Sequence, residues 1–224
     1  MVKEYLKRNK IAYDKGAEGY NARHAEFGKF NSKFYPKLLK PFQDKLKQDF
    51  CKTAKILDIG CGTGRELKIL SNHGFLAYGI DLSPKTVLIA KKNVPSAKII
   101  VGNFLTKSFN TKFHGIVMIS SFHLFPKNDV PLVLRKLNSL LVPGGYCLIS
   151  IIKSAPKHAK RSDEGYFPQK ADPRIIRFKT RYTERDFKRI FNNLSWASVS
   201  KFYRRTEREY LKQKWINIII KKNV

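Results

Sequence analysis

The sequence has little of several features that mark well-known classes of protein. Its three cysteines are odd in number and have no metal-ligand spacing, so we expect reduced thiols and no metal site. No apolar run approaches the length of a membrane span, and residues 1–10 lack the apolar core of a signal peptide. With 42% hydrophobic residues in a chain of 224, these absences predict a globular, cytoplasmic protein.

Acidic residues are also scarce, with 17 against 45 lysines and arginines, and the formal net charge is +28. Every part of the chain is basic, including the central residues 56–152. Such an even distribution is typical of a protein whose whole composition is rich in lysine. The flanking residues nevertheless carry three quarters of the excess and can form a positive field that attracts anionic partners. A nucleic-acid partner therefore remains open beside a small-molecule substrate.

The chain is organised around residues 56–64, which read Ile-Leu-Asp-Ile-Gly-Cys-Gly-Thr-Gly. The apolar start predicts a strand buried on both faces. Gly60, Gly62 and Gly64 follow at alternating positions, and residues 65–72 have helical spacing. A strand, a glycine turn and a helix N-terminus together predict a cradle for a nucleoside-type ligand.

Two cofactors compete for this cradle. A second predicted strand ends at Asp81, 21 residues after Gly60, where a carboxylate can bind ribose hydroxyls of either cofactor. A nicotinamide dinucleotide site would read G-x-G-x-x-G, whereas this chain has G-x-G-x-G with Asp58 ahead of it. That motif resembles the first motif of the class I S-adenosylmethionine (SAM) dependent methyltransferases. The resemblance implies SAM as cofactor and S-adenosylhomocysteine (SAH) as product.

Two further stretches carry the same resemblance, which covers about residues 10–222. Residues 13–20 are similar to the tyrosine-aspartate opening of small methyltransferases, a segment that folds over the cofactor. Residues 141–146 resemble the family's leucine-x-proline-glycine-glycine turn into strand five. The resemblance implies an α/β fold, a Rossmann-like seven-stranded, mostly parallel sheet flanked by helices, with the last strand antiparallel.

The expected organisation is an N-terminal helical cap over residues 1–50 and a SAM-binding core over 51–224. Within the cap, helices are predicted over about 1–16 and 31–50. Residues 154–182, which contain several prolines, are expected to form a lid or substrate loop.

The resemblance also assigns roles to residues at the strand ends. Asp58 would orient the methionine amino group, Asp81 would bind the ribose, and Ser120 would offer its carbonyl near the sulfonium. Asn103 stands where the family usually has an aspartate for the adenine. The full set of expected cofactor residues is Tyr13, Asp58, Gly60, Cys61, Gly62, Gly64, Asp81, Leu82, Asn103, Phe104 and Ser120.

His123 lies just beyond the fourth predicted strand, at the edge that faces the methyl acceptor in the family. Imidazole titrates near neutrality, so His123 is the candidate general base. At the start of the same strand, the chain departs from the family pattern, because His114 stands where the family commonly has an aspartate. The preferred interpretation is methyl transfer to a small molecule. An RNA methyltransferase, a SAM-binding protein without catalysis and a nicotinamide oxidoreductase are the alternatives.

Overall fold

A computed structural model describes residues 3–30, 34–50, 53–152, 164–168, 172–192, 194–207 and 213–224. Seven strands form one sheet in the order β3-β2-β1-β4-β5-β9-β8, and two more form a separate hairpin. The strands are β1 Lys55–Ile59, β2 Leu76–Asp81, β3 Lys98–Val101, β4 Phe113–Ile119, β5 Leu141–Ile152, β6 Glu164–Pro168, β7 Ile176–Thr180, β8 Ala197–Glu207 and β9 Gln213–Lys222. The helices are α1 Glu4–Phe30, α2 Phe34–Asp49, α3 Arg65–Asn72, α4 Pro84–Asn93, α5 Val130–Leu140 and α6 Glu184–Asn192, with short 3-10 turns η1 Phe122–Leu124 and η2 Lys127–Asp129.

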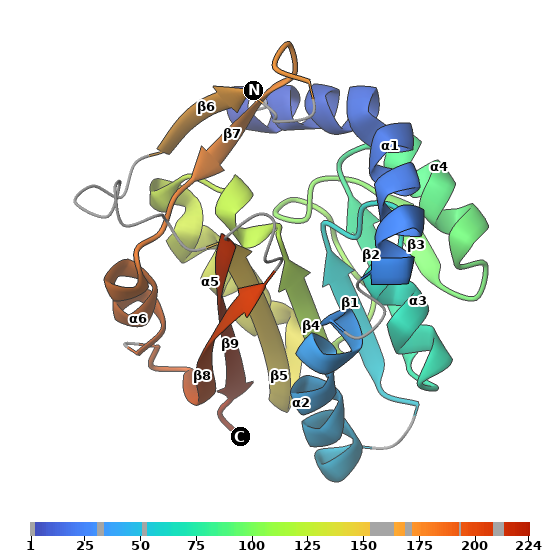
Figure 1. Cartoon of the computed structure of the whole chain (residues 1–224). Helices are drawn as coiled ribbons and strands as arrows, with labels where there is room; N and C mark the ends of the chain where they lie inside the picture. The colour runs from blue at the N-terminus through green and yellow to red at the C-terminus, as the bar shows by residue number, and fades with distance from the viewer. Residues whose placement is uncertain are drawn as a thin grey trace.

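The strand directions confirm the expected fold. β1 pairs in parallel with β2 and β4, and the parallel pairing continues to β3 on one side and β5 on the other. β9 runs antiparallel to both of its neighbours, β5 and β8. The carboxyl ends of β1, β2 and β4 therefore meet at one edge, and α1 lies above that edge in Figure 1.

Helices cover both faces of the sheet. Successive residues of a strand point to opposite faces, so they pack alternately into two hydrophobic cores. Ile56 packs with α2, α3 and α4, whereas its neighbour Leu57 packs with α5 and α6. Gly115 in β4 makes room for α2, because a Cβ there would lie 2.7 Å from the Phe42 ring. This alternation explains why the central strands read as continuous apolar runs.

Two helix starts follow the expected capping chemistry. The Ser83 Oγ accepts a hydrogen bond of 3.1 Å from Thr86 N at the start of α4. At the start of α6, the backbone N–H of Asp186 donates to Thr183 Oγ1, and the Thr183 N–H donates back to the Asp186 carboxylate. This reciprocal pair is a capping box in which aspartate takes the usual place of glutamate.

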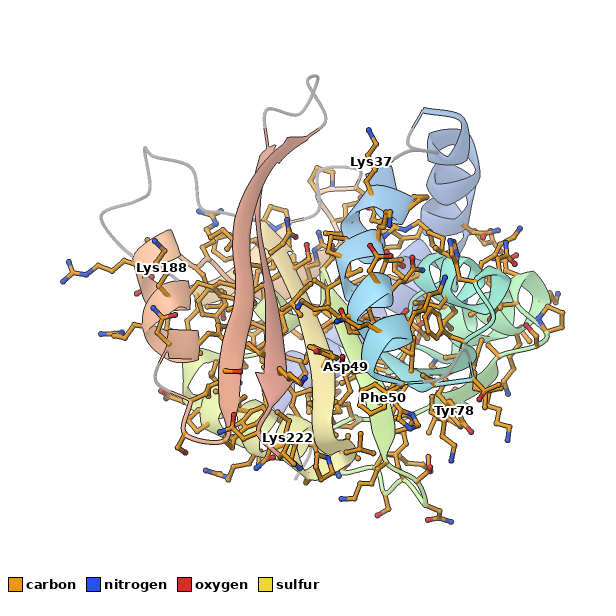
Figure 2. All side chains as sticks on the ribbon, turned by 90° about the horizontal axis from the view of Figure 1, so that it is seen from below. Lys37, Asp49, Phe50, Tyr78, Lys188 and Lys222 are labelled. Carbon is orange, nitrogen blue, oxygen red and sulfur yellow. The ribbon has the colours of Figure 1, made fainter. Side chains whose placement is uncertain are left out.

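The last residue of α2 fixes that helix to the sheet. Tyr146 of β5 and Lys221 of β9 both donate to Asp49 Oδ2, each over 2.6 Å. Figure 2 shows Asp49 at the end of α2 nearest β5, while Lys37 points outward near the other end of the helix. The N-terminal segment is therefore joined to the core by polar contacts as well as by its apolar face.

One expectation about elements needs correction. The first helix does not end near residue 16 but continues as α1 to Phe30, through the tyrosine-aspartate segment. The lid expected over residues 154–182 includes a two-stranded hairpin, β6–β7, and its residues 154–163 and 169–171 lie outside the described residues. No helix in the described ranges is both long and apolar enough to cross a membrane.

Candidate cofactor and acceptor site

The glycine turn after β1 is held against the ends of β2 and β4. Gly60 N donates to Ile80 O over 2.8 Å, and Gly60 has φ 76°. A Cβ at Gly60 would lie 2.6 Å from the Ser121 Cβ, so a side chain there would collide with the segment after β4. Gly64, with φ 90°, makes similar room for Ala90 of α4 and for Val94 just after that helix. Nothing lies within 4 Å of a Cβ at Gly62, so the middle of the turn faces open space.

Asp81 ties the glycine turn to the end of β2. Its Oδ2 accepts from Gly62 N and its Oδ1 accepts from Ser83 N, both over 2.9 Å. Burial raises the pKa of this carboxyl, although the two backbone N–H bonds act in the opposite direction. Each carboxylate oxygen retains a lone pair, so a diol can bind without displacing the backbone donors.

Asp58 is a buried carboxylate with an unsatisfied oxygen. Asp58 is 2% exposed, and its Oδ2 has no hydrogen-bond partner among the described residues. Burial and then the nearby charge of Glu66 raise the pKa of Asp58, while Arg65 lowers it. A cation or N–H donor from a ligand would satisfy this oxygen. The adjacent Cys61 is also buried, and burial raises the pKa of its thiol, so it remains protonated.

The residues expected around an adenine follow β2 and β3. Asn103 Oδ1 accepts from Leu105 N over 3.0 Å, which uses one lone pair of the amide oxygen and leaves the other. Phe104 is 4% exposed and packs edge-on against Phe125, so it belongs to the core. Leu82 is only partly buried. Of the two apolar candidates, Leu82 therefore has the surface available to a ring.

Strained backbone and buried polar groups mark the end of β4. Ser120 has φ 60°, and its N–H donates to Ser150 O over 2.9 Å. Ser121 Oγ and His123 Nδ1 are buried without a hydrogen-bond partner in the described part of the chain. Burial lowers the pKa of His123, and the charges of Lys179 and Arg177 act in the same direction, so that together they bring it to about 3. The imidazole is therefore neutral near pH 7.

Above this edge, α1 is joined to both sides of the site. Asp14 accepts a 2.6 Å hydrogen bond from Ser83 Oγ, next to Asp81. Tyr13 stacks on Tyr20, and Arg177 of β7 donates to both hydroxyls, over 3.0 and 2.8 Å. Burial is the main cause that raises the pKa of Tyr13 to about 12, and the charge of Asp81 contributes to this rise while Arg177 opposes it. Tyr13 thus lies close enough to Asp81 for their charges to interact.

These contacts define two sides of the site, which we name by their elements. The glycine-loop side consists of Asp58, Glu66 and Asp81. The hairpin side consists of Tyr13, Tyr20, His123, Arg177 and Lys179. The structure brings these residues together from five places: the turn after β1, the end of β2, the end of β4, helix α1 and the β6–β7 hairpin (Figure 1).

Several residues of the site were not singled out by the sequence argument. Arg65 and Glu66, at the start of α3, form a half-buried ion pair beside Asp58, and the Arg65 guanidinium lies 3.4 Å above the Tyr35 ring. The sequence carried one signal for Glu66, which is an acidic residue in the first helical turn after the glycine motif. Tyr20 lies two helical turns after Tyr13, a spacing that places both rings on one face of α1.

The departure at His114 has a structural explanation. Its Nδ1 accepts a 3.0 Å hydrogen bond from the N–H of Lys55, the first residue of β1, and its ring packs edge-on against Phe50. Burial and the Lys55 charge lower the pKa of His114, which favours the neutral, accepting form. The imidazole nitrogen thus serves as the acceptor that keeps β1 and β4 together at this end.

A hollow lies between α1 and the residues around the start of β7. It has a volume of about 300 Å³ and is lined by Glu4, Lys7, Arg8, Ile11, Ala12, Lys15 and residues 174–176. Since alternate strand residues face opposite sides, Ile176 points away from the side that Arg177 faces. This groove is separate from the predicted site. No cluster of three metal-ligating side chains occurs in the described residues.

Comparison with known proteins identifies the family. Residues 23–201 match the family model described as a methyltransferase domain. An uncharacterized protein of Methanocaldococcus jannaschii is 29% identical over 191 residues, 70% of this chain and 71% of that protein. A dTDP-3-amino-3,6-dideoxy-alpha-D-glucopyranose N,N-dimethyltransferase of Streptomyces fradiae is 28% identical over 100 residues, 44% of this chain and 39% of that enzyme.

The fold also matches solved structures. A SAM-dependent methyltransferase of Methanosarcina mazei superposes with a TM-score of 0.67 at 17% identity, covering 80% of this chain and 97% of that one. The sheet order and the glycine turn with an acid after β2 define the fold of class I SAM-dependent methyltransferases. The chain belongs to the methyltransferase-domain family, whose model spans most of its length. The resemblance noted in the sequence is thereby confirmed, with SAM as the cofactor of the class.

Proposed function

We propose that this methyltransferase transfers the methyl group of SAM to a small-molecule acceptor that enters between the glycine turn and the β6–β7 hairpin. The observation that carries the proposal is the bridge across the carboxyl edge, in which Arg177 of β7 donates to Tyr13 and Tyr20 of α1. We propose that this roof confines the acceptor to a space beside the end of β4. A confined space suits a small acceptor better than a base within a long polymer.

The glycine-loop side supports the placement of the cofactor. We propose that Asp81 accepts the ribose hydroxyls, and that Gly60, Gly62 and Gly64 line the cofactor backbone together with Cys61. The unsatisfied Oδ2 of Asp58 suits the positively charged methionine amino group, directly or through water. Tyr13 would cover the amino-acid end. The Ser120 carbonyl would lie near the sulfonium.

The adenine is proposed to lie between β2 and β3. Asn103 has a free lone pair on its amide oxygen for the exocyclic amine, and Leu82 offers partly exposed apolar surface. Phe104 supports this pocket from the core rather than by open stacking.

The reaction asks little of the protein beyond alignment and exclusion of water. When bound, SAM supplies a methyl group on a positively charged sulfur, so the transfer is an in-line displacement. His123 remains the proposed base for an acceptor that must lose a proton. With a pKa of about 3 it is a weak base, so the role requires a bound acceptor that raises this value.

The proposal is tested by the destination of a labelled methyl group. Methyl-labelled SAM would be incubated with the protein and either a low-molecular-weight cell extract or total RNA. We expect label in the small-molecule fraction and in no RNA species. Stable label in RNA would contradict the small-molecule acceptor. If the protein binds SAM but forms no SAH with either acceptor mixture, the result would favour a SAM-binding protein without catalysis.

An RNA acceptor is the second candidate, and the formal net charge of +28 is the observation that favours it. A phosphate track predicts that log affinity for RNA falls linearly with log salt, with a slope that reflects several contacts. We expect weak RNA binding that disappears near physiological salt. Tight binding to one RNA under those conditions would reverse the order of the two candidates.

A further inference from the structure

Arg177 carries a largely buried positive charge, and no acidic group among the described residues pairs with it. Its Nη1 donates to two tyrosine hydroxyls, and its Nε is buried without a hydrogen-bond partner. Within the described residues, Arg177 forms no ion pair with a carboxylate. A desolvated guanidinium without an anion is costly, by several kcal/mol in general. The contacts present therefore leave this charge only partly satisfied.

A second, independent feature lies beside it. His123 is 6% exposed, and its Nδ1 has no hydrogen-bond partner in the described part of the chain. The positive charges of Arg177 and Lys179 both act on its imidazole, so the two cations and the histidine share one region. Arg177 and Lys179 share one face of β7, opposite the face of the buried Phe178 and Thr180.

This region borders the edge where methyl transfer is proposed. η1 carries His123 directly after the end of β4, and β7 packs against η1. Thr180 of β7 fixes that contact, because its hydroxyl donates to Phe125 O over 2.7 Å. The orphan Nε of Arg177 and the orphan Nδ1 of His123 thus lie on the hairpin side of the proposed acceptor space.

We infer that Arg177, together with Lys179 and the neutral His123, binds a carboxylate or phosphate group on the methyl acceptor. The acceptors would then be small anionic molecules. This inference rests on the proposed small-molecule function and names the chemical class of its substrate. It also gives the two cations a role in catalysis. An anion beside them would offset the lowering of the His123 pKa that their charges cause.

The first test uses the unmodified protein saturated with SAH. Calorimetry would compare hydroxylated and aminated acids with their own carboxamides, starting with para-hydroxybenzoate and para-hydroxybenzamide. One charged hydrogen bond predicts that the preferred acid binds at least about tenfold more tightly than its amide. Inorganic phosphate should compete with that acid. A panel in which no acid is preferred over its amide would overturn the inference.

The second test removes the charge from Arg177. Arg177→Gln should lose the preference for acid over amide, and Arg177→Lys should retain part of it. The matched control is Arg174→Gln on the same hairpin, because Arg174 is 89% exposed in its side chain and pairs with Asp172. The control should keep the full preference. If Arg177→Gln does not fold, the acid-amide comparison with wild-type protein and Arg177→Lys still decides.

SAM and SAH carry a carboxylate of their own. A third experiment therefore asks whether Arg177 binds the carboxylate of the cofactor or the anionic group of the acceptor. SAH and 5′-methylthioadenosine, which lacks the amino-acid part, would be titrated into wild type and Arg177→Gln. We expect both affinities to change less than about twofold. A tenfold loss for SAH alone would assign Arg177 to the cofactor and overturn the acceptor site. A wild type that binds no SAH would instead refute the proposed function.

Discussion

The glycine-loop side of the site carries three carboxylates, whereas the hairpin side carries two cations, a neutral histidine and two tyrosines. In the proposed site, Asp58, Glu66 and Asp81 would lie on the side of a cofactor whose reactive group is positively charged. Arg177 and Lys179 face the opposite side, where the structure contains no acid paired with Arg177 among the described residues. The difference indicates that each side is arranged for a ligand group of the opposite charge.

The largest expected effect is at the joint between the two sides. Gly60→Ala adds a Cβ 2.6 Å from that of Ser121 and forces alanine to φ 76°. The crowding and the left-handed backbone together predict a loss of about 2–5 kcal/mol in the free energy of unfolding. Denaturant titration measures it. Gly19→Ala, in α1 with nothing within 4 Å of its Cβ, is the control and should be neutral or stabilising.

The glycine-loop side is tested next through Asp81. Asp81→Asn removes the charge that would strengthen hydrogen bonds from the ribose hydroxyls. Affinity for SAH should fall by about 1.5–3 kcal/mol, the range for a hydrogen bond to a charged group. Asp44→Asn on the exposed side of α2 is the control for net charge. An unchanged SAH affinity, measured by calorimetry, would remove the ribose assignment.

The hairpin side is tested through acid stability. The pKa of His123 is lowered from 6.5 to about 3 by burial and by Lys179 and Arg177, so the unfolded chain binds the proton more readily. This contribution to stability is fully present above about pH 6.5 and is lost as the pH falls toward 3. Between about pH 6.5 and 5 the loss is about 2 kcal/mol.

Replacing the histidine should make that pH dependence shallower. The free energy of unfolding of His123→Gln would be measured against pH and compared with wild type and with His73→Gln, which changes an exposed residue. We expect only His123→Gln to flatten the curve in this range. Equal slopes for all three proteins would mean that His123 is not protected from protonation by the fold.

The smallest effect is expected at the adenine pocket. Asn103→Ala removes one neutral hydrogen-bond acceptor, so affinity for SAH should fall by about 1 kcal/mol. Asn103→Asp keeps an acceptor for Leu105 N and restores the carboxylate common in the family, so it should retain the wild-type affinity. A larger loss for Asn103→Asp than for Asn103→Ala would place the adenine elsewhere.

The two sides also differ in how far the sequence predicted them. The glycine-loop side and the sheet were predictable because their signals are local, as in the G-x-G-x-G turn and the acid at the end of β2. The hairpin side depends on contacts between distant residues, since Arg177 is 164 residues from Tyr13 and 157 from Tyr20. No periodicity or motif connects such positions.

Burial was a second reason for the difference. The sequence suggested that His123 could titrate near neutrality, but the contacts of η1 with β5 and β7 bury it. Likewise, His114 appeared only as a departure from the family pattern, whereas the structure assigns it a hydrogen bond to the start of β1. In both cases the role of the imidazole depends on what the fold packs around it.

The most direct test of the contrast between the two sides is a crystal structure with SAH bound. We expect the ribose on Asp81, the amino group near Asp58 Oδ2 and the sulfur facing the space beside η1. The SAH carboxylate should not reach Arg177, which would remain available to an anionic acceptor. An SAH carboxylate bound to Arg177, or an adenosine bound away from Asp81, would contradict the division of the site into a cofactor side and an acceptor side.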